Sequence, residues 1–302
     1  MAIITTGSHP KALWPGIKAW WGRSYMEHVP EYPDLFELDT SDKAYEEEPE
    51  ITGFGLAPVK PQGSQIFYDT EVQGPVSRYT HVSYALGYIV TYEELRDDLY
   101  EVVAKRRAQQ LAFSMRQTQE NILASIYNNG FSGSYLGADG VSLMSASHPT
   151  LSGNQSNLLT TAADISEAAV EDLCIQLMNT VNNRGLKISC LPQSLHVPTA
   201  LWFESNRIIR SVLQNDTSNN AINVLRATNA FPKGIKVNHY FTSTTAWFIR
   251  TNIPRGLQYF DRDKISFDQD NDFDTKNAKA ACYQRYSAYW SDWRGIAGTP
   301  GV

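Results

Sequence analysis

The sequence has few cysteines and no long apolar run. Cys174, Cys190 and Cys282 stand alone among 302 residues, without a CxxC pair or a histidine at zinc spacing. We therefore expect small core residues of a reducing cytoplasm, and neither a disulfide framework nor a metal site. No window approaches the roughly 18 continuous apolar residues of a membrane span, and the first residues lack the basic start of a signal peptide. Contact with a membrane is not expected.

Basic residues are also scarce. The chain carries 26 lysines and arginines against 32 aspartates and glutamates, a formal net charge of −6. Tight DNA binding depends on neutralising phosphates with basic side chains, so this balance argues against a dedicated DNA-binding protein. The short run Lys105-Arg106-Arg107 is expected on an exposed helix face.

The motifs of common enzyme classes are missing. No phosphate-binding GxxxxGK[ST] or GxGxxG loop and no HExxH zinc motif occurs. Ser142 lacks the second glycine of a nucleophile elbow. His148 lies near Ser145 and Asp139 in the sequence, which leaves open a soluble hydrolase, although a structural role in a loop is the preferred interpretation. We assign no catalytic residue and no cofactor, and we expect a protein that is not an enzyme.

The acidic run Asp268–Asp274 resembles a calcium loop only in part. Aspartates recur at every second position, but Phe273 stands where an EF-hand needs glycine, and Lys279 stands where it needs glutamate. These two differences exclude an EF-hand. No metal ligand is assigned, and a weak cation site between subunits is left open.

The longest predicted element is a helix over residues 91–128. Thr91 and Glu94 have the spacing of a capping box, and no proline or glycine follows before Asn128-Asn129-Gly130. One apolar stripe at helical spacing, without a heptad seam, predicts packing against a sheet and not a coiled coil. The stripe consists of Ala108, Leu111, Ala112, Met115, Ile122 and Ile126. So long a helix favours an assembly subunit over a compact enzyme.

A predicted hairpin precedes this helix. Residues 66–71 alternate in polarity, Gly74-Pro75 provides a turn, and the return strand places Val82, Tyr84 and Leu86 on one apolar face. A hairpin of two strands is at best marginally stable alone in water. This apolar face is therefore expected to contact a neighbouring subunit.

The first 60 residues are rich in aromatic side chains and prolines. Trp14, Trp20 and Trp21 lie among prolines that break any long element. The segment either docks on a partner or wraps its own core, and both interpretations are left open. On the first, the three tryptophans are intersubunit contacts, and a chain lacking residues 1–25 folds but assembles poorly.

The second half of the chain mixes helices and strands. We expect a helix from an Asp164 cap, with Glu167 completing the capping box, to residues 183–185. A buried strand follows within residues 186–199, then a helix containing Trp202, then a polar loop over residues 214–233. Strands are expected at residues 236–241, 246–251, 257–260 and 280–286. The fold class is α+β.

Several short sequence strings resemble the major capsid proteins of tailed bacteriophages with the HK97-like fold. They occur in the family's order over most of the chain, and they are most similar to the group of the Mu-type major head subunit. They are Gly87–Glu93, Asp139–Leu143 continuing to His148-Pro149, Asn157–Leu159, Ala163–Ser166, Ala246–Ile249 and Asp292–Ile296.

The resemblance implies five segments. They are an N-terminal arm over residues 1–51, an E-loop hairpin over 52–90, a peripheral domain with a spine helix and a glycine-rich loop over 91–160, an axial domain over 161–250, and strands over 251–302 that return to the peripheral domain. It further implies pentamers and hexamers that close an icosahedral shell around the phage genome, in a virion assembled in the bacterial cytoplasm. The partners implied are a separate scaffolding protein, a portal, a decoration protein, and packaged double-stranded DNA contacted without sequence specificity.

One feature of the family's type member has no counterpart on the predicted hairpin. That protein forms lysine–asparagine cross-links through an E-loop lysine, whereas this chain has no lysine between Lys60 and Lys105. Lys60 is expected at the base of the hairpin, so the shell is expected to be held without covalent bonds. Two alternatives to a capsid protein are an encapsulin-like compartment shell and the hydrolase that would use His148.

Overall fold

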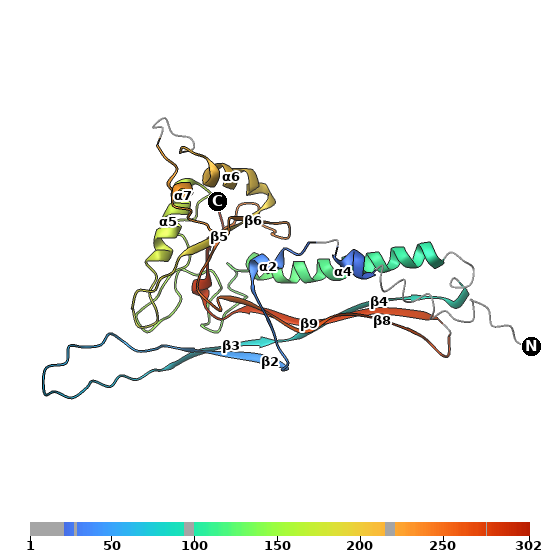
Figure 1. Ribbon diagram of the computed structural model, residues 1–302, viewed down its shortest axis with the longest axis horizontal. Coiled ribbons are helices and arrows are strands. Elements are labelled where there is room, and N and C mark those ends of the chain that lie inside the picture. The colour runs from blue at the N-terminus through green and yellow to red at the C-terminus, as the bar shows by residue number, and fades with distance from the viewer. Residues whose placement is uncertain (1–20, 27–28, 94–99, 215–220, 276) are drawn as a thin grey trace, which may run out of the picture.

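A computed structural model describes residues 21–26, 29–93, 100–214, 221–275 and 277–302 of the chain. Three sheets and several helices form a long body, a rounded domain at one end of it, and a thin arm that extends past that domain (Figure 1). Helices and sheets are mixed along the chain, as the predicted α+β class requires.

The long body is a four-stranded sheet covered on one face by helix α4. The strand order is β1-β8-β9-β4, and β8 and β9 form a long antiparallel ribbon. Their bounds are β1 Glu37–Thr40, β4 Val82–Val90, β8 Leu257–Asn271 and β9 Ala278–Trp290. The predicted strands at 257–260 and 280–286 are therefore present but extend much further than expected.

Helix α4 spans Tyr100–Asn128 and lies along strands β4 and β9 (Figure 1). Its 29 residues reach about 43 Å at 1.5 Å per residue. Ala108, Leu111, Ala112 and Met115 are buried in the core between helix and sheet, which confirms the predicted packing of this stripe. Ile122 and Ile126 pack at the edge of the neighbouring core. The predicted cap residue Glu94 lies outside the described residues.

The hairpin before α4 is built differently from the prediction. Residues 66–71 form no strand, and Gly74-Pro75 lies inside strand β3, which spans Gln73–Thr80. The partner of β3 is β2, Tyr45–Ile51, so the arm consists of these two strands and the connecting loop 52–72. The alternation of residues 66–71 was misleading because their backbone has no partner strand beside it.

Strand β4 belongs to the body and not to the arm. It pairs with β9 along its whole length, from Val82 opposite Tyr286 to Val90 opposite Ala278. The two backbones approach so closely that a Cβ atom on Gly87 would lie 2.7 Å from the carbonyl oxygen of Ala280. As the last strand in the sheet order, β4 forms an edge.

The rounded domain contains a second four-stranded sheet, of order β10-β7-β5-β6, with helices around it. Its core includes the fully buried Trp247, Leu173, Leu195 and Ile249. The strands are β5 Pro192–Pro198, β6 Ile235–Asn238, β7 Trp247–Thr251 and β10 Ile296–Thr299. The helices are α5 Glu167–Met178, η3 Thr199–Leu201, α6 Trp202–Arg210 and α7 Val224–Ala227. A short helix α2, Tyr32–Leu35, and a turn η4, Trp293–Gly295, complete the described elements.

Three sequence predictions in this domain need correction. The cap of α5 is Ser166, whose hydroxyl accepts a hydrogen bond from the Ala169 amide, whereas Asp164 accepts one from the Val302 amide. The helix ends at Met178, several residues before the predicted stop, because residues 179–187 turn back on themselves. Helix α7 also lies inside the segment predicted as a polar loop.

The three cysteines are buried, as predicted, and unpaired. Burial raises the pKa of the Cys174 thiol to about 12 and that of Cys190 to about 11, so these thiols stay protonated and act as small apolar side chains.

The acidic run falls at the end of the β8–β9 ribbon. Asp268 and Asp270 are in strand β8, where alternate residues point to the same face, and Asp272 follows in the turn. The Asp272 carboxylate is paired with the Lys279 ammonium at 2.7 Å. Among the described residues no cluster of three or more metal-ligating side chains occurs. No described helix is long and apolar enough to cross a membrane.

Candidate functional site

The hydrolase candidate His148 is a buried structural residue. Its Nδ1 atom lies 2.6 Å from a carboxylate oxygen of Asp139, and its Nε2 atom lies 3.2 Å from the amide oxygen of Asn157. The ring is fully buried and stacks on Trp293, with centroids 4.3 Å apart. Both ring nitrogens are occupied, so neither is placed to take a proton from the Ser145 hydroxyl. The cluster joins the loop after α4 to the turn before β10.

The arm offers the most exposed apolar surface of the described chain. Large side chains along loop 52–72 have more than half of their surface in solvent, which is unusual for a folded monomer and typical of a contact surface. They are Phe54, Leu56, Val59, Ile66, Phe67, Tyr68 and Val72, with exposed fractions from 52% to 93%. The first prediction of the apolar contact face, on residues 82–86, missed this larger surface.

The loop is held in an extended form by polar contacts near its base. The Asp69 carboxylate accepts hydrogen bonds from the Gly55 and Thr70 amides, and these bonds lower the pKa of Asp69. The Arg184 guanidinium donates to the Thr70 carbonyl and lies 3.8 Å from Asp69. The far end of the loop is a turn in which the Ser64 amide donates to the Pro61 carbonyl.

Arg294 ties the arm to the rounded domain at the loop end of strand β2. Its guanidinium is almost fully buried and lies 3.6 Å from Glu50, near the end of β2, and 3.2 Å from Asp292. It also donates to the side chain of Asn183 and to the Val181 carbonyl. The end of the arm strands next to the loop is therefore fixed, and the exposed loop extends from it.

The position of Lys60 differs from the prediction. It was expected at the base of the hairpin, but it directly precedes the Pro61–Ser64 turn at the far end of the loop and is exposed. The error follows from the strand assignment, since the arm starts at Tyr45 and not at residue 52.

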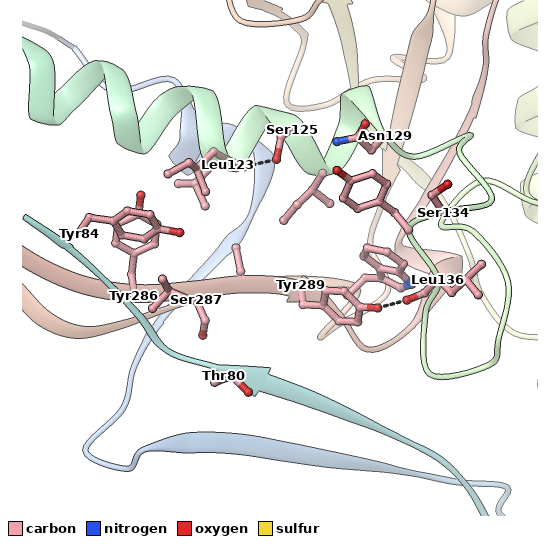
Figure 2. A pocket seen from close by; sticks show the side chains of 16 residues that line it. Thr80, Tyr84, Leu123, Ser125, Asn129, Ser134, Leu136, Tyr286, Ser287 and Tyr289 are labelled. Atoms are coloured by element: carbon pink, nitrogen blue, oxygen red, sulfur yellow. Dashed lines mark hydrogen bonds between the residues drawn. The ribbon is translucent and has the colours of Figure 1, made fainter.

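A cleft of about 430 Å³ lies where α4, β4, β9 and the loop after α4 meet (Figure 2). Val82 and Tyr84, two predicted contact residues, line it together with Ile122, Leu136 and Tyr289. The lining is mostly apolar, and Val82 and Leu136 are each about half exposed. Such a surface suits another protein chain better than a charged ligand.

The predicted contact residues fall into three groups. Val82 and Leu86 on the edge strand are 48% and 46% exposed, and Tyr84 stacks on Tyr286 and is partly buried. Trp21 is only 7% exposed and packs between Tyr25 and Phe267 of its own subunit, so it fits the alternative in which this part of the segment wraps its own core. Trp14 and Trp20 lie outside the described residues.

Some of the exposed loop could have been found from the sequence. Gly53, Gly55 and Pro61-Gln62-Gly63 are signals of turns and loops, and they surround apolar residues that have no helical or alternating pattern. Apolar side chains in a segment without secondary structure must either fold onto the core or meet a partner. The sequence alone does not distinguish these outcomes.

A sequence model of the phage capsid protein family matches residues 75–298, well over half of the chain. The chain belongs to this family. A search of curated proteins finds no match. The protein is therefore a capsid protein, and it forms the shell of a virion. The matched family does not distinguish the Mu-type group, so that part of the resemblance stays a prediction.

Solved structures show that the capsid protein has the HK97-like fold. It is similar to the capsid of a native GTA particle, with a TM-score of 0.55, 11% identity, and 89% of each chain covered. It is similar to a virus-like particle from Pyrococcus furiosus, with a TM-score of 0.54, 9% identity, and 94% and 97% of the two chains covered. A structure from Mycobacterium phage Che8 matches with a TM-score of 0.52, 13% identity, and 91% and 93% coverage. At these identities the likeness establishes the fold alone.

Proposed function

We propose that copies of this capsid protein form pentamers and hexamers, and that the arm Tyr45–Thr80 joins each subunit to a neighbour in an icosahedral shell. The observation that carries the proposal is the exposed apolar surface of loop 52–72 on an arm whose strands are tied to the rounded domain where the loop begins. Burial of apolar area drives protein association, at about 25 cal/mol per Å². An apolar loop that its own subunit leaves in solvent is therefore a strong candidate for an intersubunit contact.

The edge strand β4 supplies a complementary surface for the neighbour. Among the described strands none pairs with its outer edge, and Val82, Leu86 and Ile89 are exposed along it. An exposed sheet edge can accept an added strand, and the cleft beside it can accept apolar side chains. The predicted contact residues Val82, Tyr84 and Leu86 keep this role in the proposal.

The remaining partners follow from assembly. The shell would enclose double-stranded DNA through weak contacts without sequence specificity, because a net charge of −6 gives little release of counterions. A separate scaffolding protein, a portal and a decoration protein are the expected protein partners. The role is structural, and no catalysis is proposed for the His148 cluster.

Hydrogen exchange on free subunits and on shells tests the role of the arm. Loop 52–72 should exchange fast in the free subunit and become protected in the shell. Strand β4 is the internal control, because its amides that face β9 are hydrogen-bonded within the subunit and should be protected in both states. The proposal would be refuted by loop 52–72 exchanging at the same rate in both states.

A further inference from the structure

The rounded domain has an exposed aromatic pair that no contact of its own subunit explains. Trp202 and Phe203 begin helix α6, are 49% and 73% exposed, and hold their ring centroids 5.1 Å apart. Aromatic side chains in contact with each other and with solvent are the residues most often found at the energetic centre of protein interfaces. We call Trp202 and Phe203 the aromatic knob.

The same domain also has an apolar groove of about 620 Å³. Its wall is formed by the second half of α5, the start of β5 and helix α7, with Ile175, Met178, Leu191 and Val224 each about half exposed. A volume of this size is enough for two aromatic side chains. We call this surface the α5 groove.

The knob and the groove lie at opposite ends of strand β5. Leu191, Pro192 and Gln193 at the start of β5 line the groove, whereas the knob follows the end of β5 through the turn η3. A strand of seven residues is about 23 Å long. Figure 1 shows α5 and α6 on different sides of the domain. A subunit therefore cannot fill its own groove with its own knob.

Charge is also complementary between the two surfaces. Glu171 is the charged residue of the groove lining, and Glu167 lies one turn before it on the same face of α5. On α6, Arg207 lies one turn after Phe203 on the same face, has 57% of its side chain exposed, and lies 3.7 Å from Glu204 of the same helix. With Arg210, α6 carries two basic residues and one acidic residue, a net charge of +1. Burial, followed by the nearby charges of Glu167 and Asp172, raises the pKa of Glu171, so a cation brought to this rim would be favourable.

We infer that the aromatic knob of one subunit inserts into the α5 groove of the next subunit around a capsomer, with Arg207 beside Glu171. The contact uses two different surfaces of the same chain, and such head-to-tail contacts close into rings when the rotation between subunits allows it. The inference rests on the proposed pentamers and hexamers, and it names the residues that hold the rounded domains together within them.

Substitution of the knob tests its contribution. Phe203→Ser should raise the protein concentration needed for assembly by at least about 30-fold, the effect of losing an interface hot spot. Phe273→Ser is the matched control, because Phe273 is 94% exposed and lies in the β8–β9 turn away from both surfaces. Both variants should unfold at the same denaturant concentration as the unmodified subunit. Equal assembly by the two variants would overturn the inference.

Cross-linking tests the geometry. A chain carrying both Phe203→Cys and Met178→Cys should give a ladder of covalent products up to pentamers and hexamers when assembled capsomers are oxidised. Each single variant should give none, and an equal mixture of the two should stop at dimers. The three native cysteines are buried and should not take part.

The two proposals fail in different ways. Capsomers that form from the unmodified chain, without a ladder from the double cysteine variant, would refute the knob contact and leave the proposed capsomers standing. Dimers from the Phe203→Cys variant alone would show a symmetric contact and would also refute it. Absence of pentamers and hexamers from the unmodified chain would refute both.

Discussion

Nδ1 of the buried His148 and a carboxylate oxygen of Asp139 lie 2.6 Å apart. In sequence this pair suggests two members of a catalytic triad, but the second ring nitrogen faces Asn157 and the ring stacks on Trp293. Asn157 in turn donates to the carbonyls of Leu143 and Ile296. The pair therefore fastens the loop after α4 to the last strand of the chain.

We expect His148→Ala to destabilise the subunit by about 2–4 kcal/mol, because it leaves a partly buried carboxylate without its partner and removes the stacked ring. Urea unfolding measures this. His239→Ala is the control, since His239 also pairs with a carboxylate, that of Glu31, but has 66% of its side chain exposed and should cost less than about 1 kcal/mol. Equal losses of stability in the two variants would contradict the structural role of His148. A hydrolase activity that only His148→Ala removes would contradict it as well.

His196 should make the subunit sensitive to acid. Burial, and then the charges of Arg250, Lys236 and Lys233, lower its pKa from 6.5 to about 3. Between these two pH values the folded state binds fewer protons than the unfolded state. The subunit therefore loses stability as the pH falls from 6.5 towards 3, by at most about 1.4 kcal/mol per pH unit. His196→Gln should lose less stability than the unmodified subunit between pH 7 and pH 4.5 in urea titrations. Equal losses of stability in the variant and the unmodified subunit would show that His196 contributes nothing to the acid sensitivity.

Two truncations distinguish residues 1–20 from the residues that pack in the core. Trp21 stacks on Phe267, and the Arg116 guanidinium lies 3.9 Å from the ring centre of Tyr25. Removal of residues 1–25 should therefore destabilise the subunit by several kcal/mol, since losing one large core aromatic costs about 3–5 kcal/mol. The sequence alone led to the opposite expectation, a folded core after that deletion. Removal of residues 1–20, which keeps Trp21 and Tyr25, should destabilise the subunit less than removal of residues 1–25 and should impair assembly. Thermal unfolding and electron microscopy of the two truncated chains would test this.

The shell should be held without covalent bonds. Lys60 is exposed at the far end of the arm, and a solvated ammonium group is not a nucleophile. Boiled particles should therefore run as one band of 33.9 kDa with or without reductant. Because Lys60 lies at the far end of the arm and not at its base, Lys60→Arg is the decisive control. A ladder that this variant abolishes would identify Lys60 as the cross-linking residue.

Local patterns predicted much of the fold. The stripe from Ala108 to Met115 indicated a helix on a sheet, and the cysteines indicated core positions, because both depend on burial that sequence composition reflects. The partner of each strand was harder to predict. Strand β3 pairs with β2 across a loop of 21 residues, 52–72, and not with the strand that directly follows it. That strand, β4, pairs with β9 nearly 200 positions later.

The candidate site was predicted only in part for the same reason. Val82 and Leu86 were recognised from their alternation, and they are exposed on an edge strand. The apolar residues of loop 52–72 have no periodic pattern, so only the structure shows that they extend into solvent. The aromatic knob and the α5 groove come from separate segments of the chain. No local sequence pattern indicates that these segments lie in the same domain.

Cryo-electron microscopy of purified particles tests the central claim most directly. We expect a closed icosahedral shell of pentamers and hexamers in which loop 52–72 of each subunit lies on the body of a neighbour. An open or irregular assembly, or a closed shell in which loop 52–72 folds back on its own subunit, would contradict it.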